Sequence, residues 1–332
     1  MSQIQRMAQK VILAGGSGFV GRALAQSLVG EGWDVVILTR ASRENAAIRE
    51  VEWNATTGGA WAAELEGAAA IVNLAGRSIN CVHTLANSRE ILESRLAAVR
   101  ALGKGYARVK NPPPVWVQCS ATGIYGNAGD RTCDESLAPG PGFLAEVCRA
   151  WEDAFNALDL REVRKVVLRL GVVLGREGGA FPPLARLARN YLGGAAGSGR
   201  QYLSWVHRDD LVQMFRAALV QTNFTGIYNA CAPNPVTNTE FMRELRAALG
   251  RPWCPPAPEF VVRLAARHLL KTDDKLALQG QRCMPQRLLA AGFDFKFGRL
   301  HAALANLVDH TEAQSAPEAT RDGAVRPPAS LG

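Results

Sequence analysis

The chain has 332 residues, of which 48% are hydrophobic and 20% charged, and it carries a formal net charge of +8 at pH 7. This length and composition are typical of a soluble globular protein with one large domain or two closely joined ones. The basic residues are scattered and no apolar run is long enough to cross a bilayer, so we expect neither a nucleic-acid nor a membrane partner.

The first predicted strand, residues 10–14, leads into a glycine-rich turn and then a helical pattern. Gly16 and Gly18 would let the backbone approach a pyrophosphate, and Gly21 would let the helix pack against the strand. Free N–H groups at a helix start also favour an anion. The context predicts a dinucleotide site built from the whole turn: Gly15, Gly16, Ser17, Gly18, Phe19, Val20 and Gly21.

The second predicted strand, residues 35–39, ends without the carboxylate that often binds the ribose hydroxyls of NAD. Asp34 begins the strand and therefore lies at its remote end. Thr39 ends the strand and Arg40 follows it, at the end that faces the expected site. The Arg40 guanidinium suits a 2′-phosphate through charge-assisted hydrogen bonds. Arg43 could assist, or it could be a solvated surface charge. We therefore expect NADP(H) rather than NAD(H) as the cofactor.

Short apolar strands continue to alternate with helical patterns. The remaining strands are predicted at residues 70–74, 115–119, 165–170 and 226–230. Helices are predicted at residues 88–108, 143–158 and 209–218. This order predicts an α/β fold with a Rossmann-like, doubly wound parallel sheet.

The second half of the chain changes character. Helical patterns at residues 241–249, 259–270 and 284–291 predict a smaller, mostly helical C-terminal substrate lobe. We place the Rossmann-like domain at residues 8–230, with 176–204 contributing to the lobe, and the lobe itself at 231–308. Residues 309–332 are rich in Ala, Pro, Ser and charge and are predicted to be disordered.

The seven cysteines are an odd number without paired metal-ligand spacing. We therefore expect no metal site and reduced thiols rather than a disulfide framework. Together with the lack of an apolar signal core in residues 1–10, this pattern predicts a cytoplasmic protein.

Several linked motifs are more specific than the glycine turn. They are Asn73-Leu74-Ala75-Gly76, residues 120–126, 169–175, 205–211, 229–238 and 280–288. With these motifs the chain resembles, over about residues 10 to 308, the epimerase family proteins. That subgroup belongs to the atypical and extended short-chain dehydrogenase/reductases.

The resemblance implies a Rossmann-like domain, NADP(H) binding and a small lobe over the substrate cleft. By position it places further residues along the cofactor, namely Leu74, Ala75, Gly76, Glu90, Arg95 and Val173. Residues on one helix such as Glu90 and Arg95 could instead form a pair on the helix surface.

Catalytic members of the superfamily use a Tyr-x-x-x-Lys pair in which the tyrosine is the acid and base. This chain has such a string at residues 106–110, but it precedes the strand that it should follow, and we expect it to be the exposed end of a helix. Alignment through Glu152 places the tyrosine position at Leu144 and the lysine position at Cys148. The usual pair is therefore absent.

Ser120, Tyr125 and Asp134 are the candidates for a replacement proton donor, because they follow the strand at residues 115–119 near the expected ligand edge. Each could instead have a structural role. His207 is expected to be a structural hydrogen-bonding residue.

Two functions remain. The first is an NADP(H)-dependent oxidoreductase or epimerase-like enzyme that acts on an unknown small carbonyl or hydroxyl substrate. The second is a non-catalytic NADP(H)-binding regulatory or scaffold protein. A sugar-nucleotide epimerase is less favoured, because such enzymes use the missing tyrosine. Exposed helix faces could support a homodimer.

Overall fold

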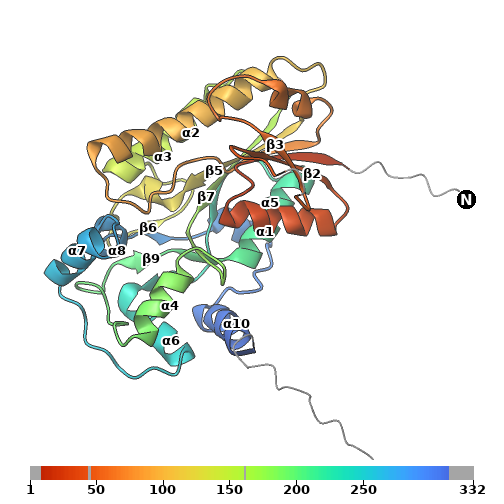
Figure 1. Cartoon of the computed structure of the whole chain (residues 1–332). Helices are drawn as coiled ribbons and strands as arrows, with labels where there is room; N and C mark the ends of the chain where they lie inside the picture. The colour runs from red at the N-terminus through yellow and green to blue at the C-terminus, as the bar shows by residue number, and fades with distance from the viewer. Residues whose placement is uncertain (1–8, 44–45, 161, 314–332) are drawn as a thin grey trace, which may run out of the picture.

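The computed structural model describes residues 9–43, 46–160 and 162–313. A seven-stranded sheet, with all strands parallel, runs through the larger part of the molecule in the order β11-β7-β5-β4-β1-β2-β3 (Figure 1). Its strands are β1 (Lys10–Ala14), β2 (Asp34–Thr39), β3 (Arg49–Glu52), β4 (Ala70–Asn73), β5 (Val115–Ala121), β7 (Arg164–Leu170) and β11 (Gly226–Ala230). The winding reverses between β1 and β4, so the predicted Rossmann-like sheet is confirmed.

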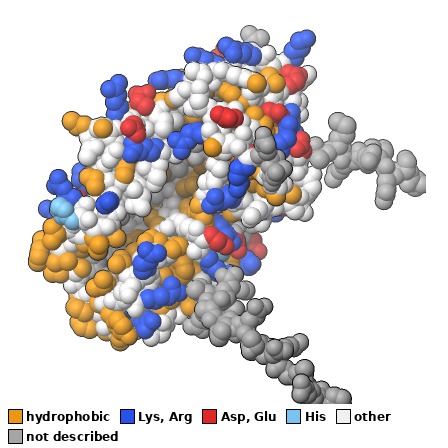
Figure 2. Space-filling view, in the orientation of Figure 1, with side chains coloured by type: hydrophobic (Ala, Val, Ile, Leu, Met, Phe, Trp, Pro, Cys, Tyr) orange, Lys and Arg blue, Asp and Glu red, His pale blue; other side chains and the backbone are white. Residues whose placement is uncertain are grey.

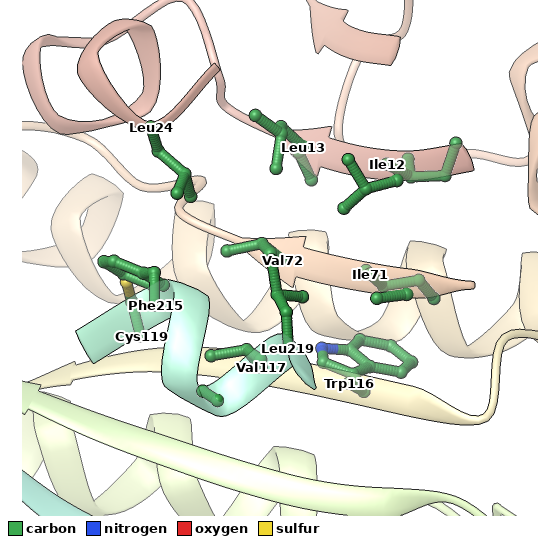
Figure 3. Packing of buried hydrophobic residues seen from close by; sticks show 14 of the residues in the cluster. Ile12, Leu13, Leu24, Ile71, Val72, Trp116, Val117, Cys119, Phe215 and Leu219 are labelled. Atoms are coloured by element: carbon green, nitrogen blue, oxygen red, sulfur yellow. The ribbon is translucent and has the colours of Figure 1, made fainter. Parts of the chain in front are cut away.

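Helices cover both faces of this sheet. They are α1 (Phe19–Gly30), α2 (Leu85–Tyr106), α3 (Phe143–Asn156) and α5 (Arg208–Val220). Helices α1 and α5 contact each other, as do α2 and α3, and the two pairs lie on opposite faces (Figure 1). Figure 3 shows Leu24 of α1 and Phe215 of α5 directed toward strands that carry Leu13 and Val72, and all four side chains are buried. Apolar strands covered on both faces explain why the predicted strand positions agree so well with the structure.

A second hydrophobic core holds the small lobe together. It joins α4 (Phe181–Arg189), α6 (Asn238–Ala248) and α10 (Leu300–Ala313). Helix α6 begins with a capping box, in which the Thr237 hydroxyl accepts from the Glu240 amide and the Glu240 carboxylate accepts from the Thr237 amide. The surface is hollowed between the lobe and the sheet domain (Figure 2). Helix α10 continues past residue 309, where the sequence predicts disorder, and residues 314–332 lie outside the described part of the chain.

The remaining elements are mostly short. They are η1 (Ala60–Leu65), η2 (Thr122–Tyr125), β6 (Thr132–Cys133), β8 (Val172–Leu174), β9 (Tyr202–Leu203), β10 (Trp205–His207), β12 (Val236–Thr237), α7 (Glu259–His268), α8 (Lys275–Leu278), β13 (Arg282–Cys283) and α9 (Gln286–Ala290). The predicted helix at 284–291 is thus shorter, because β13 pairs with β6 just before it. Among the described residues, no helix is long and apolar enough to cross a membrane.

Candidate functional site

The glycine-rich turn lies between β1 and α1, at the switch point of the sheet. Gly15 has a φ of +78°, and a Cβ added there would lie 2.9 Å from Ala75 Cα. A Cβ added to Gly21 would lie 2.5 Å from Gly16 Cα, which is closer than real contacts allow. Gly18 is the N-cap residue of α1 and offers no side chain to the first amides of the helix. The amides of Gly15, Gly16 and Gly18 donate to nearby carbonyls, so the amides left for an anion are those at the uncapped start of α1. We call the turn together with this helix start the cradle.

The end of β2 lies beside this cradle. The Thr39 hydroxyl is 3.3 Å from the Ser17 hydroxyl, which links the two segments. Arg40 is exposed, and the described residues give its side chain no hydrogen bond or ion pair. Arg43, in contrast, forms a 2.6 Å ion pair with Glu50. Of the two arginines, Arg40 is therefore the one that a phosphate could bind without displacing a carboxylate.

The loop after β4 meets the cradle from the other side. Leu74 donates its amide to Ala14 O at 2.8 Å, and the Ala75 amide donates to the Asn73 side chain at 3.1 Å. A Cβ on Gly76 would lie 3.1 Å from Cγ of Arg95. Leu74, Ala75 and Gly76 thus lie next to the glycine turn; their predicted contact with the cofactor stays a prediction.

Glu90 and Arg95 on α2 have different environments. Glu90 is exposed and pairs with Arg77 rather than with Arg95. Arg95 donates to Arg77 O at 3.0 Å and to Ile91 O at 2.8 Å, and its guanidinium lies 5.0 Å from the Trp151 ring. Burial lowers the pKa of Arg95 from its ordinary value. The predicted alternative, a Glu90–Arg95 surface pair, is therefore wrong.

Phe19, at the start of α1, contacts a glycine-rich turn that follows β8. A Cβ on Gly175 would lie 2.5 Å from Phe19 Cζ, and one on Gly178 would lie 2.6 Å from its Cδ2. Val173 lies in β8, and its carbonyl accepts from the Ala180 amide at 3.0 Å. These glycines leave room for the Phe19 ring, which joins the cradle to the segment that leads into the lobe. The sequence shows the glycines but not their contact with Phe19.

Two candidate catalytic hydroxyls, of Ser120 and Tyr125, belong to one buried network around Arg169 and Glu152. The guanidinium donates two hydrogen bonds to the Glu152 carboxylate, at 2.9 and 2.8 Å, and one to the Tyr125 hydroxyl at 2.9 Å. The Ser120 hydroxyl donates to Glu152 at 2.6 Å. The Tyr125 oxygen also lies 2.8 Å from Asn229 Oδ1. Glu152, Arg169 and Asn229 are members of this network that sequence reasoning missed.

This network favours a structural role for both hydroxyls. Tyr125 is 0% exposed, and burial raises the pKa of its hydroxyl well above the ordinary value, against the opposing effect of Arg169. A phenol that is buried and holds its proton this firmly is poorly suited to proton exchange with a substrate. The Ser120 hydroxyl is buried as well and already donates its proton to Glu152.

Asp134 lies apart from the glycine cradle. Its carboxylate accepts from the Ser136 amide at 2.9 Å and from the Ser136 hydroxyl at 2.5 Å, and these bonds lower its pKa. The residue lines an open hollow beside edge strand β11, together with Gly226 and Arg287. An ionised carboxylate at this place stabilises its own loop, and the geometry favours this role over proton donation.

The positions of the usual tyrosine–lysine pair carry no acid. Leu144 lies on α3, where a Cβ added to Gly123 would approach its Cβ to 3.7 Å. Cys148, one turn later, is buried, and burial raises the pKa of its thiol to about 11 against the opposing charge of Arg95. Tyr106 lies at the end of α2, 6.4 Å from the ring of Trp116 at the start of β5. It is buried rather than exposed as predicted, and it lies at the amino edge of the sheet, away from the cradle.

Comparisons with known proteins agree with this geometry. Residues 11–231 match the NAD dependent epimerase/dehydratase family, and residues 257–307 match a domain of unknown function, DUF1731. The chain belongs to the NAD-dependent epimerase/dehydratase family. The family resemblance stated from the motifs is therefore confirmed.

Alignments with named relatives of this family cover most of the chain. The epimerase family protein YfhF of Bacillus subtilis is 34% identical over 301 residues, which cover 90% of this chain and 97% of YfhF. The crystal structure of human epimerase family protein SDR39U1 with NADPH is 33% identical, has a TM-score of 0.81, and covers 90% of this chain and 99% of the human chain. The chloroplastic SDR39U1 homolog of Arabidopsis thaliana is 34% identical, over 89% of this chain and 85% of its own length.

Within the described residues, no group of three or more His, Cys, Asp or Glu side chains could hold a metal ion. All seven cysteines of this epimerase family member carry free thiols in the structure.

The close approach at Gly21 yields a stability prediction. Gly21→Ala should lower the free energy of unfolding by about 1–3 kcal/mol, because the new methyl group would meet the Gly16 backbone at 2.5 Å. Gly30→Ala is the matched control in the same helix, since a Cβ there would meet nothing within 4 Å. Urea unfolding of the two variants measures the difference. Equal stability of both would show that the turn does not constrain α1.

His207 yields a pH prediction. It is the N-cap of α5, with Nδ1 accepting from the Asp209 amide at 3.1 Å, so its expected structural role is confirmed. Burial lowers its pKa from 6.5 to about 4. The unfolded chain therefore binds a proton at higher pH than the folded chain, and stability should fall as pH falls from about 6.5 toward about 4.

The variant His207→Asn keeps an acceptor at the N-cap and removes this titration. We expect it to lose less stability than the parent protein between neutral pH and about pH 5. Only in the parent does an imidazole that is buried and neutral in the folded state gain a proton on unfolding, and this proton uptake favours the unfolded state as pH falls. Urea unfolding at the two pH values measures both losses. Parallel losses in parent and variant would contradict the assignment.

Proposed function

We propose that this protein binds NADP(H) and acts as an NADP(H)-dependent oxidoreductase or epimerase-like enzyme on a small carbonyl or hydroxyl substrate. The observation that carries the proposal is the cradle at the switch point together with Arg40 directly after β2, whose side chain has no partner among the described residues; residues 39–43 contain no carboxylate. A 2′-phosphate needs such a cation, whereas a ribose hydroxyl of NAD favours a carboxylate at this place.

The residues present fit a dinucleotide. Gly15 and Gly21 leave space only for backbone at the turn, and the uncapped amides of α1 can receive a pyrophosphate. Arg40 would hold the 2′-phosphate, while Gly76, with Arg95 behind it, would border the far half of the cofactor. The solved human relative is a complex with NADPH, which supports the same assignment here.

When bound, the cofactor supplies or accepts the hydride. The chain's own residues bind and orient it, and the proton must come from a group other than a tyrosine–lysine pair. Because Ser120 and Tyr125 donate within the buried network, we infer that water or the substrate itself carries this proton. The Glu152–Arg169 pair holds the end of β5 through Ser120 and the end of η2 through Tyr125.

A second candidate function is a non-catalytic NADP(H)-binding protein with a regulatory or scaffold role. It is favoured by the apolar Leu144 and the protonated thiol of Cys148 at the positions of the usual pair. Both functions require the same cofactor site and differ only in turnover.

The cofactor assignment is tested with Arg40→Ala. We expect it to weaken NADPH binding by about tenfold or more and NADH binding little, because it removes a charge-assisted contact to the 2′-phosphate. Arg43→Ala is the matched control, since the Arg43 charge is already paired with Glu50. Calorimetric titration measures all four affinities. Equal losses of NADPH and NADH affinity in Arg40→Ala would overturn the assignment.

Turnover distinguishes the two functions. We expect oxidation of NADPH, followed by its absorbance, with at least one member of a panel of small aldehydes and ketones. Tyr125→Phe should keep the parent's kcat for that substrate, because the Tyr125 hydroxyl is structural. A large loss of kcat in a folded Tyr125→Phe would contradict the assigned role. Tight NADPH binding without any turnover across the panel would favour the non-catalytic function.

A further inference from the structure

Large apolar side chains gather on the outside of the lobe around α7. We call this surface the α7 face and define it by Tyr191, Leu192, Trp253, Phe260, Leu264 and Leu269. Each is strongly exposed, from 61% for Tyr191 and Leu264 to 75% for Trp253. Figure 2 shows hydrophobic side chains crowded over α7 and the segment beside it. Contiguous exposed apolar surface of this kind marks an interaction site rather than ordinary surface variation.

The α7 face combines two stretches of sequence. Phe260 and Leu264 are one turn apart and point outward from α7, whereas Ala266 points inward and is 3% exposed. The segment that carries Trp253 is tied to Tyr191, because the Arg251 guanidinium donates to the Tyr191 hydroxyl at 3.3 Å and the Cys254 thiol donates to Tyr191 O at 3.1 Å. The two stretches also pair just before α7, where the Gly197 amide donates to Ala257 O at 2.9 Å and the Ala257 amide donates to Ala195 O at 2.8 Å.

The charges around this surface are mainly positive. Residues 186–192 and 251–271 contain six Lys and Arg residues, namely Arg186, Arg189, Arg251, Arg263, Arg267 and Lys271. They contain one acidic residue, Glu259, and both Glu259 and the nearby Asp274 pair with Arg263, at 2.5 and 3.6 Å, so the other five cations make up the positive excess. A second copy of the chain would bring these cations against each other, so the charge favours an anionic partner over self-association.

The residue types also indicate what kind of anionic partner would fit. Trp and Tyr prefer the boundary between headgroups and acyl chains, and long basic side chains extend from an apolar contact to lipid phosphates. Helix α7 has Phe260 and Leu264 on its exposed side and basic residues beside them and after its end. This is the pattern of a helix that lies in the membrane interface.

We propose that the α7 face docks this protein peripherally on an anionic lipid bilayer. This revises the expectation of no membrane partner, which came from the lack of a spanning segment and does not bear on surface docking. Helix α8 follows α7, and Asp273 before it lies 3.5 Å from His83, just before α2. Docking would therefore hold the lobe and the α2 entrance at the bilayer surface.

Cosedimentation of the full chain with vesicles tests the proposal. Vesicles of phosphatidylcholine alone are compared with vesicles that also contain phosphatidylglycerol, at low and high salt. We expect binding to the anionic vesicles that weakens with salt, and little binding to neutral ones. Lack of binding to anionic vesicles at low salt would overturn the proposal.

Surface variants locate the contact. The double variant Phe260→Ser/Leu264→Ser should reduce vesicle binding by about tenfold or more, and Arg267→Glu/Lys271→Glu should do the same. Val220→Ser, at an exposed position at the end of α5, is the matched control and should bind as the parent does. Vesicle binding unchanged in both α7 variants would overturn the proposal.

Two further readouts separate the alternatives. The first is the oligomeric state. If the parent is a dimer and the Phe260→Ser/Leu264→Ser variant is a monomer, and the parent does not bind vesicles, the α7 face binds a second copy and the lipid proposal is contradicted. NADPH binding measured in parallel should be unchanged in every α7 variant. The docking proposal can thus fail without the cofactor proposal failing, and the reverse also holds.

Discussion

The first turn of α1 lies against the loop that precedes it, with no space for a side chain at Gly21. This close approach directs the uncapped amides of the helix toward the switch point between β1 and β4. It also places Phe19 against the glycines that follow β8, at the beginning of the path into the lobe. The nucleotide cradle and the connection to the lobe therefore depend on the same packing contact. A substitution at this contact would therefore disturb both the cofactor site and the connection to the lobe.

A second constraint is the buried pair of Glu152 and Arg169. Both side chains are almost completely buried, and each compensates the charge of the other. Removing one partner of such a pair typically costs about 3–5 kcal/mol, because the other charge is left buried. The same pair holds the hydroxyls of Ser120 and Tyr125, two of the three groups that the sequence offers as proton donors. The Ser120 and Tyr125 hydroxyls thus stabilise the fold and are not free to transfer a proton to a substrate, whereas the cofactor cradle is preserved.

Much of the fold could be predicted from the sequence, because the strands of a covered parallel sheet are short apolar runs. Strands β1 and β11 have their predicted bounds, and the glycine turn could be located by its place after β1. Strand β3 was missed because charged residues fill most of it and it forms the sheet edge. The pairing of Arg169 with Glu152, and the contact of Phe19 with Gly178, join residues far apart in the chain. No local pattern marks such contacts, so the roles of Ser120 and Tyr125 could not be decided from sequence.

The cradle and Arg40 together are proposed to form the NADP(H) site. Calorimetric titration of the parent protein with NADPH and with NADH, at matched ionic strength, tests this proposal most directly. We expect one NADPH bound per chain, at least about tenfold more tightly than NADH, since only NADPH offers the 2′-phosphate. A folded protein that binds neither nucleotide, or binds NADH as tightly as NADPH, would contradict it.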